Sequence, residues 1–108
     1  MVRPDEYTAH LLDLLRQIGP VQTARFFGGL ALKLDGRQFG MVMNGHLYFV
    51  VDDRTRPAYE RAGSKPFSYT TKRARVDVRR YFEVPADAQE DPLAFRALAR
   101  GALLAAGP

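Results

Sequence analysis

The chain has 108 residues, of which 46% are hydrophobic and 26% charged, and it carries a formal net charge of +4 at pH 7. This length and composition predict one soluble globular domain over residues 1–108, with a single core. The sequence has no cysteine, which excludes a disulfide framework, a thiolate metal site and thiol redox chemistry, and no apolar run approaches the ~20 residues of a membrane span. We therefore expect a cytoplasmic protein without a membrane contact, and its positive charge permits an acidic partner such as nucleic acid.

The first predicted element is a helix. Pro4, Asp5 and Glu6 suit its first turn, where acids interact with the positive end of the helix dipole. Apolar residues then recur at helical spacing, at Tyr7, Leu11, Leu14, Leu15 and Ile18. Gly19 and Pro20 end the helix, because glycine is favoured just past a helix and proline cannot continue it.

Residues 21–26 form a connector that an extended backbone would suit, and Phe27-Gly28-Gly29 follows it. The glycines indicate a bend or bulge at the entrance of a strand. A phosphate-binding loop is the weaker interpretation, because the spacing fits neither a P-loop nor a dinucleotide-binding fingerprint.

Three short strands joined by two tight turns are predicted between Phe27 and Asp52. The turns are Asp35-Gly36 and Asn44-Gly45, because both dipeptides suit type I′ hairpins, whose two central residues need positive φ. Apolar residues recur at every second position along the strands, as expected of half-buried strands. The three apolar rows are Leu30, Leu32 and Leu34; Phe39, Met41 and Met43; and Leu47, Phe49 and Val51. The segment is therefore predicted to be an antiparallel meander.

A short helix is predicted over residues 54–62, after the meander. Asp52 and Asp53 precede it, and an aspartate at this position accepts hydrogen bonds from the free amides of the first turn. Pro57 is tolerated so early in a helix, and Gly63 ends it. Adjacent aspartates also suggest a metal site, but no third ligand follows at a recognisable spacing, so capping is the better interpretation.

Two further strands are predicted over residues 67–71 and 76–84, with a basic turn at residues 72–75. The second strand alternates irregularly, because Arg80 falls on the face of its apolar residues, which are Val76, Val78, Phe82 and Val84. Either a bulge shifts the register there, or the arginine lies on the apolar side and its guanidinium reaches water or a carboxylate.

The last element is a helix that begins at Asp91-Pro92, an N-cap followed by proline at the first helical position. Its apolar stripe consists of Phe95, Leu98, Ala99, Ala102 and Leu103. The helix ends at Gly107-Pro108. The order is α-β-β-β-α-β-β-α, which predicts an α+β domain whose antiparallel five-stranded sheet is covered by helices on one face.

Several motifs of the chain resemble, in the same order, those of the TfoX N-terminal domain family, which are FGG, LDGR-x-F, LYLKVD, AGS-x-PF-x-Y and YYEVP. In this sequence these five motifs lie at residues 27–29, 34–37, 47–52, 62–69 and 81–85, and the dipeptide at residues 55–56 also contributes to the resemblance. Phe26 and Phe82 stand where we expect a methionine and a tyrosine, and both keep bulk and apolarity. The resemblance covers nearly the whole chain.

The resemblance implies a regulator rather than an enzyme. Two-domain members of the family promote the expression of DNA-uptake genes during natural competence, together with the cyclic-AMP receptor protein. This chain is similar to their N-terminal domain alone, so we expect a stand-alone bacterial copy of that domain. The family supplies no catalytic motif, and the resemblance therefore transfers no site residue.

The polar residues of the sequence make a weak case for catalysis. His10 and His46 lie far apart, without a matching nucleophile and carboxylate, and solvent-facing positions explain both. Ser64 and Ser68 are explained equally well as loop and strand residues. We therefore predict no catalytic residue, no metal ligand and no cofactor.

Two hypotheses for the function remain. The preferred one is a non-enzymatic protein-interaction domain in transcriptional regulation, whose partner would be a transcription regulator such as the cyclic-AMP receptor protein. The alternative is a nucleic-acid-binding protein that uses the basic segment 72–80, and the absence of a helix-turn-helix signature argues against it. We also expect a homodimer, because a small antiparallel sheet leaves at least one edge strand free for pairing.

The nucleic-acid alternative rests on Lys72, Arg73, Arg75 and Arg79. If the strand alternates, its arginines emerge with Tyr81 on the side opposite Val76 and Val78, and such a mixture of cations with an aromatic ring suits a single-stranded nucleic acid. The competing interpretation is a solvated outer face on which Asp77 and Glu83 pair with the arginines and dilute the positive field.

Overall fold

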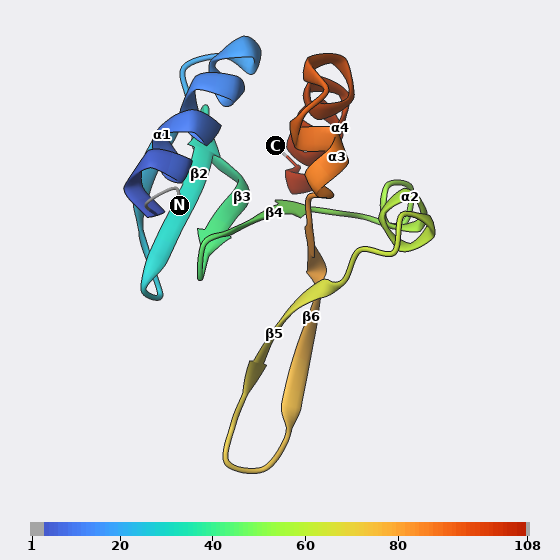
Figure 1. Cartoon of the computed structure of the whole chain (residues 1–108). Coiled ribbons are helices and arrows are strands. Elements are labelled where there is room, and N and C mark those ends of the chain that lie inside the picture. The colour runs from blue at the N-terminus through green and yellow to red at the C-terminus, as the bar shows by residue number, and fades with distance from the viewer. Residues whose placement is uncertain (1–3, 108) are drawn as a thin grey trace.

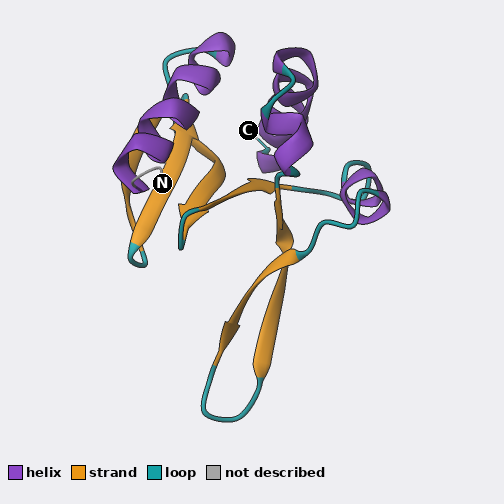
Figure 2. Cartoon of the chain, in the orientation of Figure 1, coloured by secondary structure: helices purple, strands orange, loops and turns teal. Residues whose placement is uncertain are grey.

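Six strands form one antiparallel sheet, and α1 and α4 pack on one face of it (Figure 1, Figure 2). The computed structural model describes residues 4–107. The helices are α1 (Pro4–Leu15), α2 (Arg56–Arg61), α3 (Ala86–Gln89) and α4 (Pro92–Ala106), with a 3₁₀ turn, η1, at Arg16–Ile18. The strands are β1 (Gln22–Phe26), β2 (Gly29–Leu34), β3 (Arg37–Met43), β4 (His46–Val50), β5 (Pro66–Thr70) and β6 (Arg75–Glu83). Their order in the sheet is β1-β2-β3-β4-β6-β5.

The α+β class and the antiparallel sheet are confirmed, but the predicted count of five strands is wrong. The additional strand is β1, which we had predicted to be a connector. Four of its five side chains are exposed, so the strand carries no apolar row that a pattern could reveal. Backbone pairing with β2, from Gln22↔Lys33 to Phe26↔Gly29, holds it at the edge of the sheet. The element order differs from the prediction for this reason, and because α3 is also additional.

The two predicted hairpin turns are confirmed by their backbone angles. Asp35 and Gly36 have φ of 52° and 78°, and Asn44 and Gly45 have φ of 53° and 78°. These are the positive values that a type I′ turn requires at both central residues.

A third turn of the same kind joins β1 to β2. Phe27 and Gly28 have φ of 48° and 81°, so this segment is a hairpin turn rather than the predicted bend or bulge. Gly29 is required for a different reason, because a Cβ there would collide with the carbonyl oxygen of Val42 on β3.

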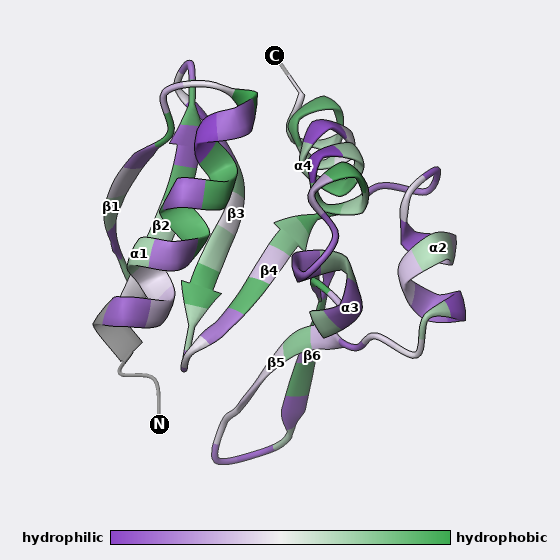
Figure 3. Cartoon of the chain, turned by 45° about the horizontal axis from the view of Figure 1, so that its top comes forward, coloured by the Kyte–Doolittle hydropathy of each residue, from purple (hydrophilic) through white to green (hydrophobic). Residues whose placement is uncertain are grey.

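The core lies between the sheet and the two long helices. Phe49 of β4 is fully buried, with its ring centroid 5.9 Å from that of Phe39 and 5.7 Å from that of Phe95 on α4. The buried members of the core are Leu11, Leu15, Leu32, Leu34, Phe39, Val42, Leu47, Phe49, Val51, Tyr59, Phe82, Val84, Phe95, Ala99 and Ala102. The predicted stripes of the first and last helices and the predicted row on β4 are therefore confirmed. Figure 3 shows this concentration of hydrophobic residues along the central strands and α4.

The predicted apolar row on β3 is wrong because the strand contains a bulge. Leu32 pairs with Gly40 and Lys33 pairs with Gln38, so Phe39 is an extra residue between two paired positions. Phe39 joins the core under the helices. Met41 and Met43, which we had placed in the same row, lie instead on the opposite face, where they line a groove.

The irregularity that the sequence shows around Arg80 is also a bulge, which confirms the first of the two alternatives. Pro66 pairs with Phe82, whereas the next residue of β5, Phe67, pairs with Val78. Three residues of β6 therefore lie between these two pairs. The prediction that Val78 and Phe82 share a face is therefore wrong. Phe82 lies in the core, and Val78 lines the groove on the other face.

The last helix begins at its predicted cap. The Oδ1 atom of Asp91 accepts hydrogen bonds from the amides of Leu93 at 3.1 Å and Ala94 at 3.3 Å, which satisfies two donors of the first turn. None of the helices within residues 4–107 has the length and apolar character that crossing a membrane requires.

Candidate functional site

The motifs around residues 62–69 and 81–85 join α2 to the end of β6. The Ser64 hydroxyl donates a hydrogen bond to the carbonyl oxygen of Glu83, and the Glu83 amide donates to the carbonyl oxygen of Lys65 at 3.0 Å. Beyond this joint, the Gln89 side chain of α3 donates to the carbonyl oxygen of Val84 at 3.1 Å. Ser64 is thus engaged with the backbone, and these motifs have a structural explanation.

The two histidines lie at exposed positions, as predicted. His46 does make one contact that the sequence did not reveal, because its Nδ1 atom lies 2.8 Å from Oε2 of Glu83 on the neighbouring strand β6. Both side chains are about half exposed, at 56% and 40%. His10 lies on the exposed side of α1, distant in the chain from this pair.

The N-cap of α2 is Thr55, which makes no side-chain cap bond, so the predicted aspartate cap of the helix is wrong. Asp52 instead caps the turn that precedes α2. Its Oδ1 atom accepts hydrogen bonds from the amides of Arg54 and Thr55, both at 3.0 Å. The bond from the Thr55 amide contributes most to holding the pKa of the Asp52 carboxyl below its usual value. The helix itself is shorter than predicted and spans Arg56–Arg61. Asp53 pairs with Arg56 at 2.8 Å.

Acidic and imidazole side chains do not gather into a metal site in the part of the chain that the structure describes. Groups of three or more His, Asp or Glu residues that could hold a metal ion are absent from residues 6–107, whose side chains the structure describes. The capping interpretation of the adjacent aspartates is the one that their hydrogen bonds support.

The four cations of the nucleic-acid alternative lie on the β5–β6 hairpin, which projects from the body of the domain (Figure 1). Arg75 pairs with Asp77 at 3.2 Å, and Arg79 pairs with Glu60 of α2 at 3.4 Å. Lys72 and Arg73 occupy the exposed turn of the hairpin, and neither forms an ion pair within residues 4–107. Two of the four cations, Arg75 and Arg79, are therefore paired with acids, whereas Lys72 and Arg73 are not.

The expectation that Tyr81 lies beside these arginines is wrong. The bulge in β6 rotates Tyr81 onto the same side as Val78, where both line the groove. Its hydroxyl accepts a hydrogen bond from the side-chain amide of Gln38 on β3 at 3.1 Å. Burial raises the pKa of this phenol. The expected pairing of Asp77 with an arginine is confirmed, whereas Glu83 contacts His46 instead.

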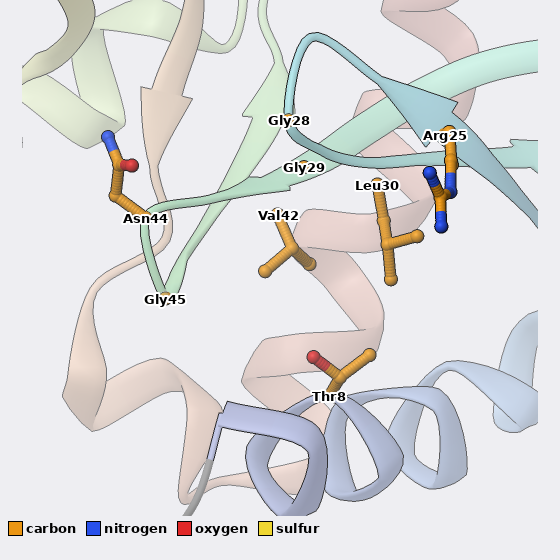
Figure 4. Close-up of a pocket in the computed structure, with 8 residues that line it drawn as sticks. All are labelled: Thr8, Arg25, Gly28, Gly29, Leu30, Val42, Asn44 and Gly45. Atoms are coloured by element: carbon orange, nitrogen blue, oxygen red, sulfur yellow. The ribbon is translucent and has the colours of Figure 1, made fainter.

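One cavity, of about 660 Å³, lies between α1 and the ends of the first strands (Figure 4). Leu30 and Val42 point toward Thr8 of α1, and Asn44 points away from them (Figure 4). Arg25 is the one charged residue of the lining. The lining has no paired acid and base groups, and it holds no histidine or carboxylate that could activate the Thr8 hydroxyl as a nucleophile.

A second cavity is an apolar groove on the face of the sheet opposite α1 and α4. Met41 and Met43 of β3 lie between two walls, of which one comes from the β1–β2 turn and the other from the β5–β6 hairpin. The lining consists of Phe26, Phe27, Met41, Met43, Phe67, Tyr69, Val78 and Tyr81. Its volume of about 470 Å³ is within the range of ligand-binding sites. We refer to these eight residues as the open-face groove.

The walls of the open-face groove expose large rings to solvent. Phe27 is 85% exposed and Tyr69 is 48% exposed. Two other rings of the groove are held in place by neighbouring side chains. The ring of Phe67 packs edge-on against that of Tyr48 with 5.3 Å between centroids, and the Tyr81 hydroxyl is hydrogen-bonded to Gln38. The groove is therefore largely preformed, with its two most exposed rings on opposite walls.

Sequence reasoning missed this groove because two bulges and one unpredicted strand create it. The bulge at Phe39 turns the methionines to the open face, and the bulge before Phe82 brings Tyr81 beside Val78. One signal was available in residues 39–43. The two faces there carry Phe39 and Val42 on one side and Met41 and Met43 on the other, so apolar residues occupy both.

Comparison with protein families supplies one match. The sequence model described as the TfoX N-terminal domain matches residues 13–106, which is nearly the whole chain. No curated protein matches the sequence.

Proposed function

Because the chain belongs to the TfoX N-terminal domain family, we propose that it is a non-enzymatic regulatory domain that acts in the cytoplasm by binding another protein. The family is one of competence-related regulators, and a domain of that kind needs a surface for its partner.

The observation that supports this proposal is the open-face groove. Single exposed apolar residues are ordinary on protein surfaces, and Leu93 and Leu104 of α4, at 78% and 79% exposure, are of that kind. Phe27 and Tyr69 differ from them because they flank a continuous apolar hollow. Contiguous apolar surface with a polar border is typical of interaction sites.

The partner that we propose is a transcription regulator such as the cyclic-AMP receptor protein, and the genes affected would be those for DNA uptake. This follows the role of the two-domain regulators whose N-terminal domain the chain resembles. A role in transcription without catalysis also agrees with the polar residues of the domain, since Ser64, His46 and Asp52 are each engaged in structural contacts.

The proposal is tested in the bacterium that encodes the chain. Deleting the gene should lower the transcripts of DNA-uptake genes, and the wild-type chain should restore them. Purified cyclic-AMP receptor protein of the same organism should give a saturable heat of binding to the domain in calorimetry. Unchanged transcripts together with no heat of binding would reject the proposal.

A matched pair of variants connects the binding to the groove. Phe27→Asn with Tyr69→Thr removes both exposed rings, and we expect it to fail in restoring the transcripts. Leu104→Gln removes an equally exposed apolar residue from α4, and we expect it to restore them. The asparagine keeps the turn intact, because Asn-Gly suits a type I′ turn.

Self-association is part of the same proposal. The ends of the sheet order leave β1 and β5 as edge strands, and four residues of β1 are exposed. Edge strands present unpaired backbone groups that a second copy can match. We propose a homodimer through β1, and multi-angle light scattering that gives the mass of one chain at high micromolar concentration would reject it.

A further inference from the structure

The open-face groove combines fixed walls with an adaptable base. Phe67 and Tyr81 are held by Tyr48 and Gln38, so a ligand would not need to order them. Met41 and Met43 are almost fully buried, and methionine has an unbranched, polarisable side chain that fits irregular apolar groups. The groove is therefore suited to bulky apolar side chains of a partner rather than to one rigid small molecule.

The charges around the groove indicate whether its partner should be acidic or basic. Of the acids of the bordering strand β6, Asp77 is paired with Arg75 and Glu83 is hydrogen-bonded to His46. Lys33 on β2 and Lys72 and Arg73 in the hairpin turn form no ion pair within the described residues. Cations without an ion pair thus lie at two separate places, one beside Gln38 and one beyond Tyr69.

We propose that the open-face groove binds an acidic peptide segment that carries two bulky apolar side chains. One apolar side chain would pack against Phe27 and Met43, and the other against Tyr69 and Val78. Carboxylates of the segment would meet Lys72 and Arg73 at one end and Lys33 at the other. This inference rests on the proposed function, because it names the surface and the chemistry by which the domain would hold its protein partner.

A nucleic acid fits this groove less well than a peptide. Its phosphates require cations along the path of the backbone, and all eight residues that line the groove are uncharged. A peptide places its charges only at the ends of the groove and its apolar groups within it, which is the distribution that the structure presents.

The test uses a fluorescein-labelled peptide of sequence DEFSGSLDE and the full chain. Two control peptides replace all its acids by lysine or all its apolar residues by serine. Polarisation should show saturable binding of the first peptide, and both controls should bind at least tenfold more weakly. In ¹³C-methyl spectra the signals of Met41 and Met43 should shift with the first peptide only.

Variants of the domain locate the binding. Phe27→Asn with Tyr69→Thr should weaken the peptide at least tenfold, and Lys72→Glu with Arg73→Glu should weaken it several-fold and reduce its loss of affinity with salt. Leu104→Gln should bind as the wild type does. Unchanged urea midpoints of the variants establish that they are folded.

Four outcomes would overturn the inference. The first is that the methionine signals do not move at millimolar peptide, and the second is that the lysine peptide binds equally well. The third is that a nine-nucleotide single strand of DNA causes larger shifts than the peptide. The fourth is that the shifts follow the concentration of the domain alone, which would place a second copy in the groove. If the peptide fails while the cyclic-AMP receptor protein still binds, this inference is wrong and the proposed function stands. If neither binds and the transcripts do not change, the proposed function is wrong.

Discussion

The two faces of the sheet are built from the same strands but have different properties. On the covered face, Phe49 and Phe82 are sealed under helices and are at most 1% exposed. On the open face, Tyr69 is 48% exposed and Tyr81 is half-buried, and the methionines between the walls lie outside the main core. The covered face is occupied by the protein's own helices, whereas the open face retains apolar surface that a partner could bury. We infer that the covered face determines the stability of the domain and that the open face determines its binding to a partner.

The largest expected effect is a loss of stability, and it is measured by comparing Phe49 with Tyr48, neighbours in the chain that lie on opposite faces of the sheet. Phe49→Ala should lower the free energy of unfolding by about 3–5 kcal/mol, because it removes a buried ring and leaves a cavity between Phe39 and Phe95. Tyr48→Ala on the open face should cost less than half as much, since Tyr48 is only partly buried. Urea denaturation of both variants measures the difference. Equal losses would show that the open face contributes as much to stability as the covered one.

Much of the covered face could be predicted from the sequence, because helical and strand periodicity report burial on one side. The row on β4, the stripes of α1 and α4 and both Asx-Gly turns follow from that rule. The open face could not be predicted in this way. A bulge inserts one residue at Phe39 and inverts the facing of Met41 and Met43. The apolar residues of segment 39–43 indicate that both faces are apolar but do not locate the bulge. The strand β1 could not be predicted for a related reason. An edge strand with exposed side chains is held by backbone hydrogen bonds and shows no apolar pattern.

A second prediction concerns the turn that maintains the facing of β3 and β4. Gly45→Val should lower the free energy of unfolding by more than about 1 kcal/mol, because a β-branched residue resists positive φ. Gly45 has φ of 78°, and a Cβ there would meet no other atom within 4 Å, so the cost would come from the backbone alone. Gly101→Ala within α4, where the Cβ would lie 3.4 Å from Thr55 and φ is not positive, provides the contrast and should not destabilise the domain. A Gly45→Val variant with an unchanged urea midpoint would contradict the turn assignment.

A third prediction separates stability from binding at a single residue. Phe27→Asn should change the free energy of unfolding by no more than about 0.5 kcal/mol, as exposed substitutions usually do. The ring packs edge-on against Phe26 at 4.7 Å, but it is 85% exposed, and the loss of this contact is offset because asparagine tolerates positive φ better than phenylalanine does. A loss above 1 kcal/mol in urea would mean that the open face needs this ring to fold.

The last prediction concerns the outer side of the β5–β6 hairpin, where we expect no effect. A short DNA duplex and a single strand, each followed by fluorescence polarisation, should show no salt-sensitive binding at physiological ionic strength. Arg75 and Arg79 are already paired with Asp77 and Glu60, so binding a phosphate would first require these pairs to open.

The alternative makes a different quantitative prediction for the same titration. If Arg73, Arg75 and Arg79 each neutralised one phosphate of a duplex, the slope of log K against log salt would be about −2.7, and replacing all three by alanine would bring it close to zero. Replacing Arg73 alone should then remove about one third of the slope, because it would account for one of the three neutralised phosphates. Tight binding with such a slope, lost in the triple variant, would assign the hairpin to nucleic acid. A flat and weak titration leaves its paired arginines as a solvated face, with the apolar side of the same hairpin as the wall of the groove.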